Sequence, residues 1–134
     1  VIENTLARMT SASSEVHAWL GPAIGHDNFE VGPEVRAAML DADPGCAACF
    51  VRGRADRWYA DLYALAQRRL QATGVIHISG GGHCTVSNPA LHSFRDNGVG
   101  SGRMASLVWN RSPGAACAPC TSTQQQRAYP AGLP

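Results

Sequence analysis

Apolar residues recur along the chain with the spacing of helices and of short buried strands. In residues 58–73 they fall three and four positions apart, which predicts an amphipathic helix that Gly74 ends. Residues 16–20 and 75–79 are short apolar runs bounded by glycine, and they predict strands. A helix, a strand and a glycine-rich loop in this order indicate the α/β (or α+β) class, with a mixed sheet flanked by helices.

Three further segments add to this pattern. Residues 1–9 predict a helix already under way, because their apolar residues share one face. Pro33 after a glycine and before a glutamate predicts a helix start, with Val35, Met39 and Leu40 directed toward the core. Residues 103–109 form an apolar run that predicts a last strand, whereas residues 83–102 are expected to form a loop.

The domain organisation follows from a change in composition. We expect residues 1–110 to form one domain and residues 111–134, rich in Pro, Ser, Thr and Gln, to form a low-complexity disordered tail. The chain starts inside a predicted helix without an initiator Met or a signal peptide, so we expect the natural polypeptide to continue upstream.

Charge and cysteine usage narrow the class of protein. The formal net charge is +1 and no basic stripe stands out, which argues against nucleic-acid binding. No apolar run approaches the length of a membrane span, so no membrane partner is expected. Five cysteines, an odd number without a secretory signal, predict a reducing, cytoplasmic location.

The first candidate for chemistry is Cys84, which follows three glycines at the end of a predicted strand. Glycines there let the backbone approach a ligand closely, and a thiol so placed can act as a nucleophile or a metal ligand. The alternative is a small buried residue, which is the commoner role of a cysteine beside glycines. His83 is adjacent, but neighbours on an extended chain point to opposite faces.

The second candidate lies about ten residues further along, in a segment that contains His92 and Arg95. Arg95 can hold a phosphate or carboxylate through two hydrogen bonds, and its alternative is a surface ion pair with Asp96. His92 can transfer protons or bind metal, or it can be a solvated surface residue.

Two Cys-x-x-Cys pairs, Cys46/Cys49 and Cys117/Cys120, have the spacing of tetrahedral zinc ligands. The segment between them is far longer than in compact zinc ribbons and includes a predicted helix. Neither pair opens a helix after a strand, as a redox pair would. A zinc or redox role is therefore the less favoured interpretation.

Several motifs, taken together, resemble a known family. Residues 18–25 read Ala-Trp-Leu-Gly-Pro-Ala-Ile-Gly, and a Cys-Thr pair begins at Cys84. Ser93-Phe-Arg and a Gly-Arg-Met-Ala sequence around Arg103 follow in the same order. In order and spacing these motifs resemble the C-terminal half of YfiH-type domains, which are also described as laccase-like multicopper polyphenol oxidoreductases, polyphenol oxidases, peptidoglycan editing factors and purine nucleoside phosphorylases or adenosine deaminases.

The resemblance implies a single α/β domain that processes purine nucleosides with phosphate, or phenolic substrates, with one zinc or copper ion. It implies catalytic roles for Cys84 and Arg95 and substrate-binding roles for Ser93 and Arg103. Asp96 stands where the family usually has a second arginine. The family's His and Cys metal ligands would lie upstream of Val1, so no metal ligand and no tightly bound metal are expected in this chain.

The function predicted on this basis is that of a metal-dependent purine nucleoside phosphorylase or deaminase, or of a laccase-like oxidoreductase. Because this chain lacks the half of the domain that holds the metal ligands, we expect it to be inactive alone. Without its other half, the sheet is expected to self-associate through exposed edges. Two alternatives stay open: a non-enzymatic zinc-binding module built on the Cys-x-x-Cys pairs, and a cysteine hydrolase that uses Cys84 with His92.

Overall fold

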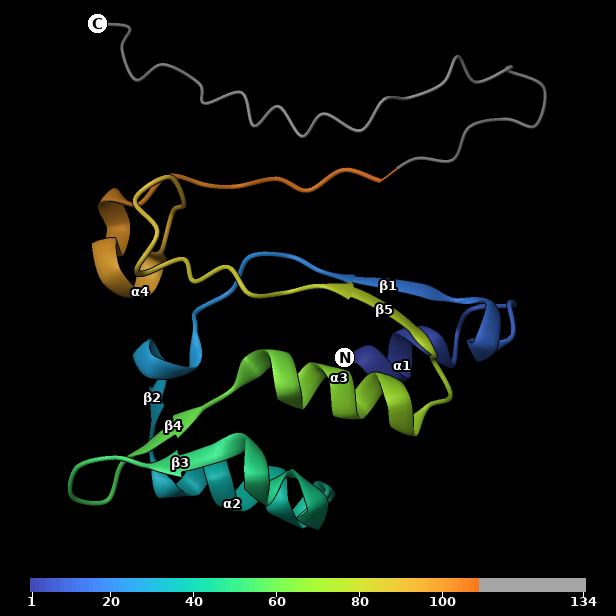
Figure 1. Cartoon of the computed structure of the whole chain (residues 1–134), viewed down its shortest axis with the longest axis horizontal. Helices are drawn as coiled ribbons and strands as arrows, with labels where there is room; N and C mark the ends of the chain where they lie inside the picture. Colours follow the sequence, from blue (N-terminus) through green and yellow to red (C-terminus); the bar gives the residue numbers. More distant parts are fainter. Residues whose placement is uncertain (109–134) are drawn as a thin grey trace, which may run out of the picture. The chain divides into compact units, whose positions relative to one another are not determined.

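The computed structural model describes residues 1–108. The predicted tail at residues 111–134 lies outside these residues. The unit Val1–Met104 contains four helices, α1 (Ile2–Leu6), α2 (Pro33–Ala42), α3 (Leu62–Ala72) and α4 (Phe94–Asn97). It also contains five strands, β1 (His17–Leu20), β2 (Glu30–Val31), β3 (Phe50–Arg52), β4 (Trp58–Ala60) and β5 (His77–Gly80) (Figure 1).

The strands form a parallel pair and a separate antiparallel sheet. β1 pairs in parallel with β5, in a register that runs from His17 opposite His77 to Leu20 opposite Gly80. β4 lies between β2 and β3 and is antiparallel to both. The α/β class predicted from the sequence is confirmed, with parallel and antiparallel pairing divided between two sheets. The rings of His17 and His77 stack across the parallel pair, with centroids 4.3 Å apart.

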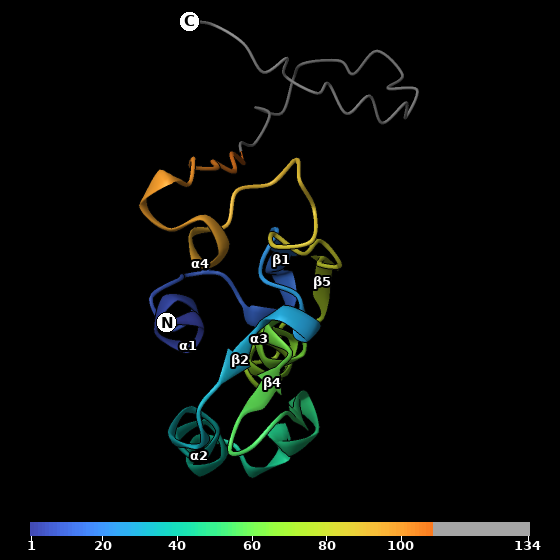
Figure 2. The same cartoon turned by 90° about the vertical axis from the view of Figure 1, so that its left-hand side faces the viewer.

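Helix α3 connects β4 to β5 and runs below the β1–β5 pair in Figure 1, while Figure 2 shows the helix nearly end-on. Its N-terminus is set by Asp61, whose carboxylate accepts a hydrogen bond from the Ala64 N–H at 2.9 Å. Leu65 and Leu70 are buried, as the predicted apolar stripe requires. The prediction of a helix beginning at residue 58 was wrong, because Trp58–Ala60 pairs as a strand before this cap.

The main hydrophobic core lies between the antiparallel sheet, α3 and the 3₁₀ turn Pro44–Cys49 that follows α2. Its buried members are Val31, Cys46, Cys49, Phe50, Ala60 and Leu65. Leu40 of α2 packs against this cluster. Val35 and Met39 are each 37% exposed, so the prediction that they face the core was wrong. The prediction is confirmed for Leu40, which packs against the cluster, whereas Val35 and Met39 lie one turn apart on a face of the helix that is only partly covered.

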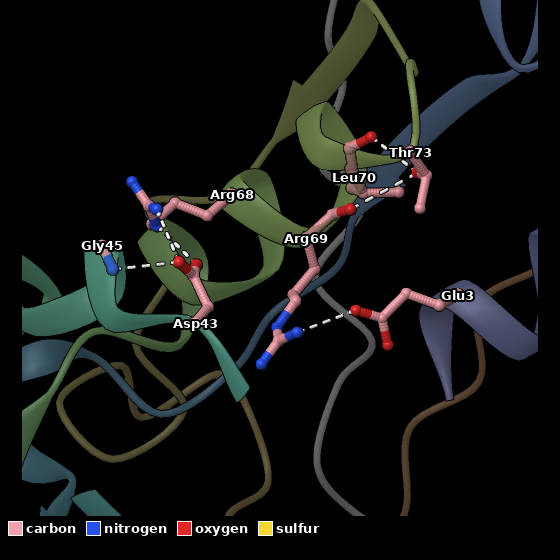
Figure 3. Close-up of polar contacts among 7 residues, drawn as sticks. All are labelled: Glu3, Asp43, Gly45, Arg68, Arg69, Leu70 and Thr73. Carbon is pink, nitrogen blue, oxygen red and sulfur yellow. Dashed lines mark hydrogen bonds and ion pairs between the residues drawn. The ribbon is translucent and has the colours of Figure 1, made fainter. Parts of the chain in front are cut away.

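Two ion pairs attach neighbouring elements to α3 (Figure 3). Arg68 donates two hydrogen bonds of 3.0 Å to Asp43, which also accepts from the Gly45 N–H at 3.0 Å. The hydrogen bonds from Arg68 lower the pKa of the Asp43 carboxyl. Arg69 donates to Glu3 at 2.9 Å and so links α1 to α3. Helix α1 ends at Leu6, earlier than the residue 9 predicted from the sequence.

Three other segments differ from the sequence prediction. Strand β5 begins at His77 rather than at the buried Val75, which lies in the turn after α3. The region predicted as a loop at residues 83–102 includes the short helix α4. No strand forms at residues 103–108, so that part of the predicted last strand was wrong. The apolar run there has no partner strand in the described part of the chain.

The β1–β5 pair has open sides. Each strand has only one strand partner among residues 1–108, and Trp19 and Ile76 on or beside these strands are exposed. Self-association through such edges therefore stays a prediction of this fold. None of the helices found in residues 1–108 is both long and apolar enough to cross a membrane.

Candidate functional site

Cys84 lies where the loop after β1 meets the loop after β5. It forms an isolated parallel bridge with Ala23. The Thr85 N–H donates to the Ala23 carbonyl at 2.9 Å, and the Ala23 N–H approaches the His83 carbonyl at 3.3 Å. The bridge extends the parallel pairing of β1 and β5 beyond the glycines, so the two loops form one structural unit.

The Cys84 sulfur accepts hydrogen bonds from several directions. The Gly25 N–H lies 3.1 Å away, the Asn28 side-chain amide 3.4 Å and the Ser87 N–H 3.5 Å. Hydrogen bonding from Ser87, through its side chain and then its backbone, together with Gly25, lowers the pKa of the Cys84 thiol to about 6. At neutral pH the group is therefore mainly a thiolate held among donors.

The approach of Gly25 to Cys84 depends on the absence of a side chain at residue 25. A Cβ at Gly25 would lie 2.9 Å from the Cys84 Cβ and 3.1 Å from its sulfur. Both distances are shorter than normal van der Waals contact, so the sulfur would have to move away from the N–H that it accepts. The glycine is a spatial requirement of this contact, since its backbone conformation is one that other residues also adopt.

Tyr63 joins the same two loops from helix α3. Its hydroxyl accepts from the Ala23 N–H at 2.9 Å and lies 2.7 Å from the His83 carbonyl and 3.2 Å from the Gly21 carbonyl. From the sequence, Tyr63 is expected to be a core or rim residue like Tyr59, without a role in the site. Its position one residue after the apolar Leu62, on the half-buried side of α3, was the only available signal.

A cavity of about 500 Å³ opens beside this junction. Its polar lining consists of Thr85, His92, Ser93 and Arg95. Its apolar lining consists of Pro22, Ala23, Ile24, Phe29, Leu62 and Phe94. Ser93 and Thr85 are buried, with 4% and 8% of their surfaces exposed. Of the residues predicted to form the site, Ser93 and Arg95 therefore share one cavity. Cys84 does not line this cavity, but the next residue, Thr85, does.

Arg95 lies at the exposed rim of the cavity. Its guanidinium carbon is 5.2 Å from the centre of the Phe29 ring, and one nitrogen lies 3.5 Å from the Glu30 carbonyl. It forms no ion pair with Asp96 or another carboxylate of the described residues. The guanidinium is thus oriented by an aromatic face while its charge stays available.

Arg103 belongs to a second, adjoining hollow of about 330 Å³ that also contains His92 and Phe94. One guanidinium nitrogen donates to the Ser101 and Gly102 carbonyls at 2.8 and 3.1 Å. The guanidinium carbon is 5.8 Å from the Phe94 ring centre. The structure therefore separates Arg103 from the cavity of Ser93 and Arg95, with His92 and Phe94 on the border.

The geometry does not support a hydrolase that uses Cys84 with His92. Within residues 1–108 the partners of the sulfur are Gly25, Asn28 and Ser87, and no histidine lies within hydrogen-bond distance of it. A general base has to be within reach of the proton that it removes. His92 lies instead on the exposed side of the cavity.

The Cys46/Cys49 pair belongs to the hydrophobic core. Burial raises the pKa of the Cys49 thiol, followed by the effect of nearby Cys46, which disfavours the thiolate that zinc requires. Cys117 and Cys120 lie outside the described residues. Residues 1–108 contain no group of three or more His, Cys, Asp and Glu side chains that could hold a metal ion. They do not supply the ligand set of a catalytic zinc or copper centre.

Comparison with known proteins places this geometry in a family. The family model described as "Multi-copper polyphenol oxidoreductase laccase" matches residues 1–111. The chain belongs to this family. This chain is similar to the crystal structure of a Neisseria meningitidis protein classed as DUF152, with a TM-score of 0.70 and 41% sequence identity. The match covers 72% of this chain and 40% of that one.

The curated relatives of this chain carry the name purine nucleoside phosphorylase. A purine nucleoside phosphorylase of Xylella fastidiosa (strain Temecula1 / ATCC 700964) is 42% identical over 111 residues, which are 81% of this chain and 43% of the relative. Purine nucleoside phosphorylase YfiH of Escherichia coli (strain K12) is 42% identical over 110 residues, or 81% of this chain and 44% of the relative. The chain thus spans less than half the length of these relatives. The resemblance to YfiH-type proteins is confirmed at the level of the family.

Proposed function

We propose that this chain forms the nucleoside-binding wall of a purine nucleoside phosphorylase domain. In that reaction an oxygen of inorganic phosphate bonds to C1′ of the ribose while the C1′–N9 bond breaks. The bonding electron pair leaves with the base, and the proton carried by the phosphate ends on the base. The observation that carries the proposal is the cavity in which Ser93, Thr85 and Arg95 meet, in a chain whose relatives carry this name.

Arg95 is the proposed contact for phosphate. Its guanidinium is exposed, oriented by Phe29 and free of carboxylate partners among the described residues. A guanidinium binds phosphate through charge-assisted hydrogen bonds, which are about twice as strong as neutral ones. Cys84 is a positioning residue in this scheme, because its sulfur holds Gly25 and Asn28 and does not line the cavity.

The test is phosphate binding by the 134-residue chain and its Arg95→Ala variant, measured by calorimetry with inorganic phosphate, alone and with inosine. We expect Arg95→Ala to weaken phosphate binding about tenfold or more, since a hydrogen bond to a charged group contributes about 1.5–3 kcal/mol. Arg54→Ala is the matched control, because Arg54 is also exposed but lies in the β3–β4 hairpin. Equal phosphate affinity in both variants would show that Arg95 has no such role.

The same preparations separate the phosphorylase proposal from the zinc-module alternative. We expect elemental analysis to find no tightly bound zinc or copper in the chain. One zinc per chain, whose removal by a chelator unfolds the protein, would favour the Cys-x-x-Cys module instead.

A further inference from the structure

The cavity beside Cys84 has walls that suit a flat, largely apolar group. Ile24, Phe29, Leu62 and Phe94 line it, and the Phe94 side chain is 60% exposed. Small-molecule sites of about 300–1,000 Å³ are typically lined by apolar and aromatic side chains with a few polar groups that fix orientation. A bare phosphate is strongly hydrated and loses hydrogen bonds against such walls, whereas a heteroaromatic ring gains contact.

Two hydroxyl side chains in the lining of this cavity have no hydrogen-bond partner among the described residues. No hydrogen bond from the side chain of Ser93 or Thr85 to another residue is found in the described part of the chain, although both residues are more than nine-tenths buried. Ser93 is the N-cap of α4, where a serine normally bonds to the first turn of the helix, and here it makes no such bond. Neither hydroxyl oxygen is sealed from solvent without a partner, since Arg36 Nε is the one side-chain polar atom of that kind among the described residues. These hydroxyls are therefore available to a ligand.

The charged group stands apart from the hydroxyls. Arg95 lies at the rim, while Ser93 and Thr85 are buried members of the lining. A nucleoside has the same division, with an apolar base that carries hydrogen-bonding edges and a polar ribose on which phosphate attacks. A hydroxyl both donates and accepts, so it can pair with a ring nitrogen or with an exocyclic group of a purine.

We propose that this cavity is the base pocket of the nucleoside site, in which the Ser93 and Thr85 hydroxyls hydrogen-bond the edge of a purine. This inference rests on the proposed function and deepens it, because it assigns the base to these hydroxyls and the phosphate to Arg95. Thr85 thereby becomes a specificity-determining residue.

The experiment is titration of the 134-residue chain with hypoxanthine, a purine base without ribose or phosphate, followed by calorimetry or ligand-observed NMR. We expect Ser93→Ala and Thr85→Val each to weaken hypoxanthine binding about tenfold, which corresponds to one hydrogen bond of about 1.4 kcal/mol. Thr85→Ser keeps the hydroxyl and should retain most of the affinity. Ser14→Ala, an exposed serine in the turn Ser13–Glu15, is the control.

Folding and phosphate binding provide two independent readouts. Because neither hydroxyl has a protein partner among the described residues, neither variant should lower the melting temperature, and both should keep the phosphate affinity that depends on Arg95. An affinity for hypoxanthine that neither substitution changes overturns the base-pocket assignment. Phosphate or inosine binding without hypoxanthine binding also overturns it and leaves the proposed function standing. If inosine, phosphate and hypoxanthine all fail to bind, both proposals are wrong.

Discussion

Gly80→Ala should destabilise the fold severely, whereas Gly82→Ala, in the same loop, should cost much less. Both glycines have positive φ, +81° and +79°, so alanine at either position adds backbone strain of about 1–2 kcal/mol. A Cβ at Gly80 would also lie 2.5 Å from the Leu20 carbonyl oxygen and 2.9 Å from two ring atoms of Trp19. No atom lies within 4 Å of a Cβ at Gly82.

The difference arises because the collision at Gly80 involves backbone. The Leu20 carbonyl accepts a hydrogen bond from the Gly81 N–H at 2.7 Å, so moving the carbonyl away also weakens the connection between β1 and β5. We expect Gly80→Ala to lower the free energy of unfolding by about 3 kcal/mol or more. Urea titration of both variants at pH 7 measures the two losses. Equal losses would mean that backbone strain alone, and not the close approach to Leu20, makes glycine necessary at residue 80.

Cys84 should react with iodoacetamide along a pH profile whose midpoint lies near 6, while Cys46 and Cys49 should stay almost unreactive at neutral pH. The thiolate is the reacting species, and hydrogen bonds from Ser87 and Gly25 lower the Cys84 pKa to about 6. Cys46 and Cys49 are buried in the core, and burial raises the pKa of Cys49. Mass spectrometry of the digested protein reports each cysteine separately.

A substitution at residue 87 tests the cause of the shift. Ser87→Ala removes the side chain that lowers the pKa most, so the midpoint of the alkylation profile should move to higher pH. Ser14→Ala should leave the midpoint unchanged. A wild-type midpoint above pH 8 would show that the donors around the sulfur do not stabilise a thiolate.

The same thiolate makes stability depend on pH in a defined direction. Because the pKa is lower in the folded chain than its usual value of 9.0, the stabilisation is complete above pH 9 and disappears as the pH falls to about 6. The unfolding free energy of the wild type, compared with Cys84→Ser at each pH, should therefore rise between pH 6 and pH 9.

The elements that depend on local signals could be predicted from the sequence. Helix α3 has an apolar stripe and a glycine stop, and the apolar run of residues 16–20 predicts a strand. The prediction that this strand is buried was wrong, because none of residues 17–20 is buried and Trp19 is 53% exposed. The antiparallel sheet could not be predicted, because β2 contains only two residues and β3 and β4 contain three each. Strands this short show no alternation, and they are stabilised by pairing and by burial around Phe50 and Ala60.

Residues of the candidate site could be predicted only where they belong to a motif that resembles the family. Ser93 and Arg95 came from the resemblance to the family, and the structure brings them to one cavity. Thr85 belongs to the Cys-Thr pair of these motifs but received no role of its own. Tyr63 acts through contacts with Ala23, 40 positions away, and His83, 20 positions away, for which a single sequence has no local signal. The same limit applies to Val35 and Met39, whose helical spacing is correct but whose burial depends on what packs against α2.

The parallel junction between the two loops has a consequence for the order of folding. The Gly25–Cys84 contact joins residues 59 positions apart, whereas β3 and β4 are neighbours along the chain. Forming the distant contact has the larger loop-closure entropy, so we expect the hairpin and α3 to form first and the cavity to assemble last. In native-state hydrogen exchange, the amides of Ala23, Gly25 and Thr85 should then exchange before those of α3. A cavity that closes last is also the part of the molecule that opens most readily without global unfolding.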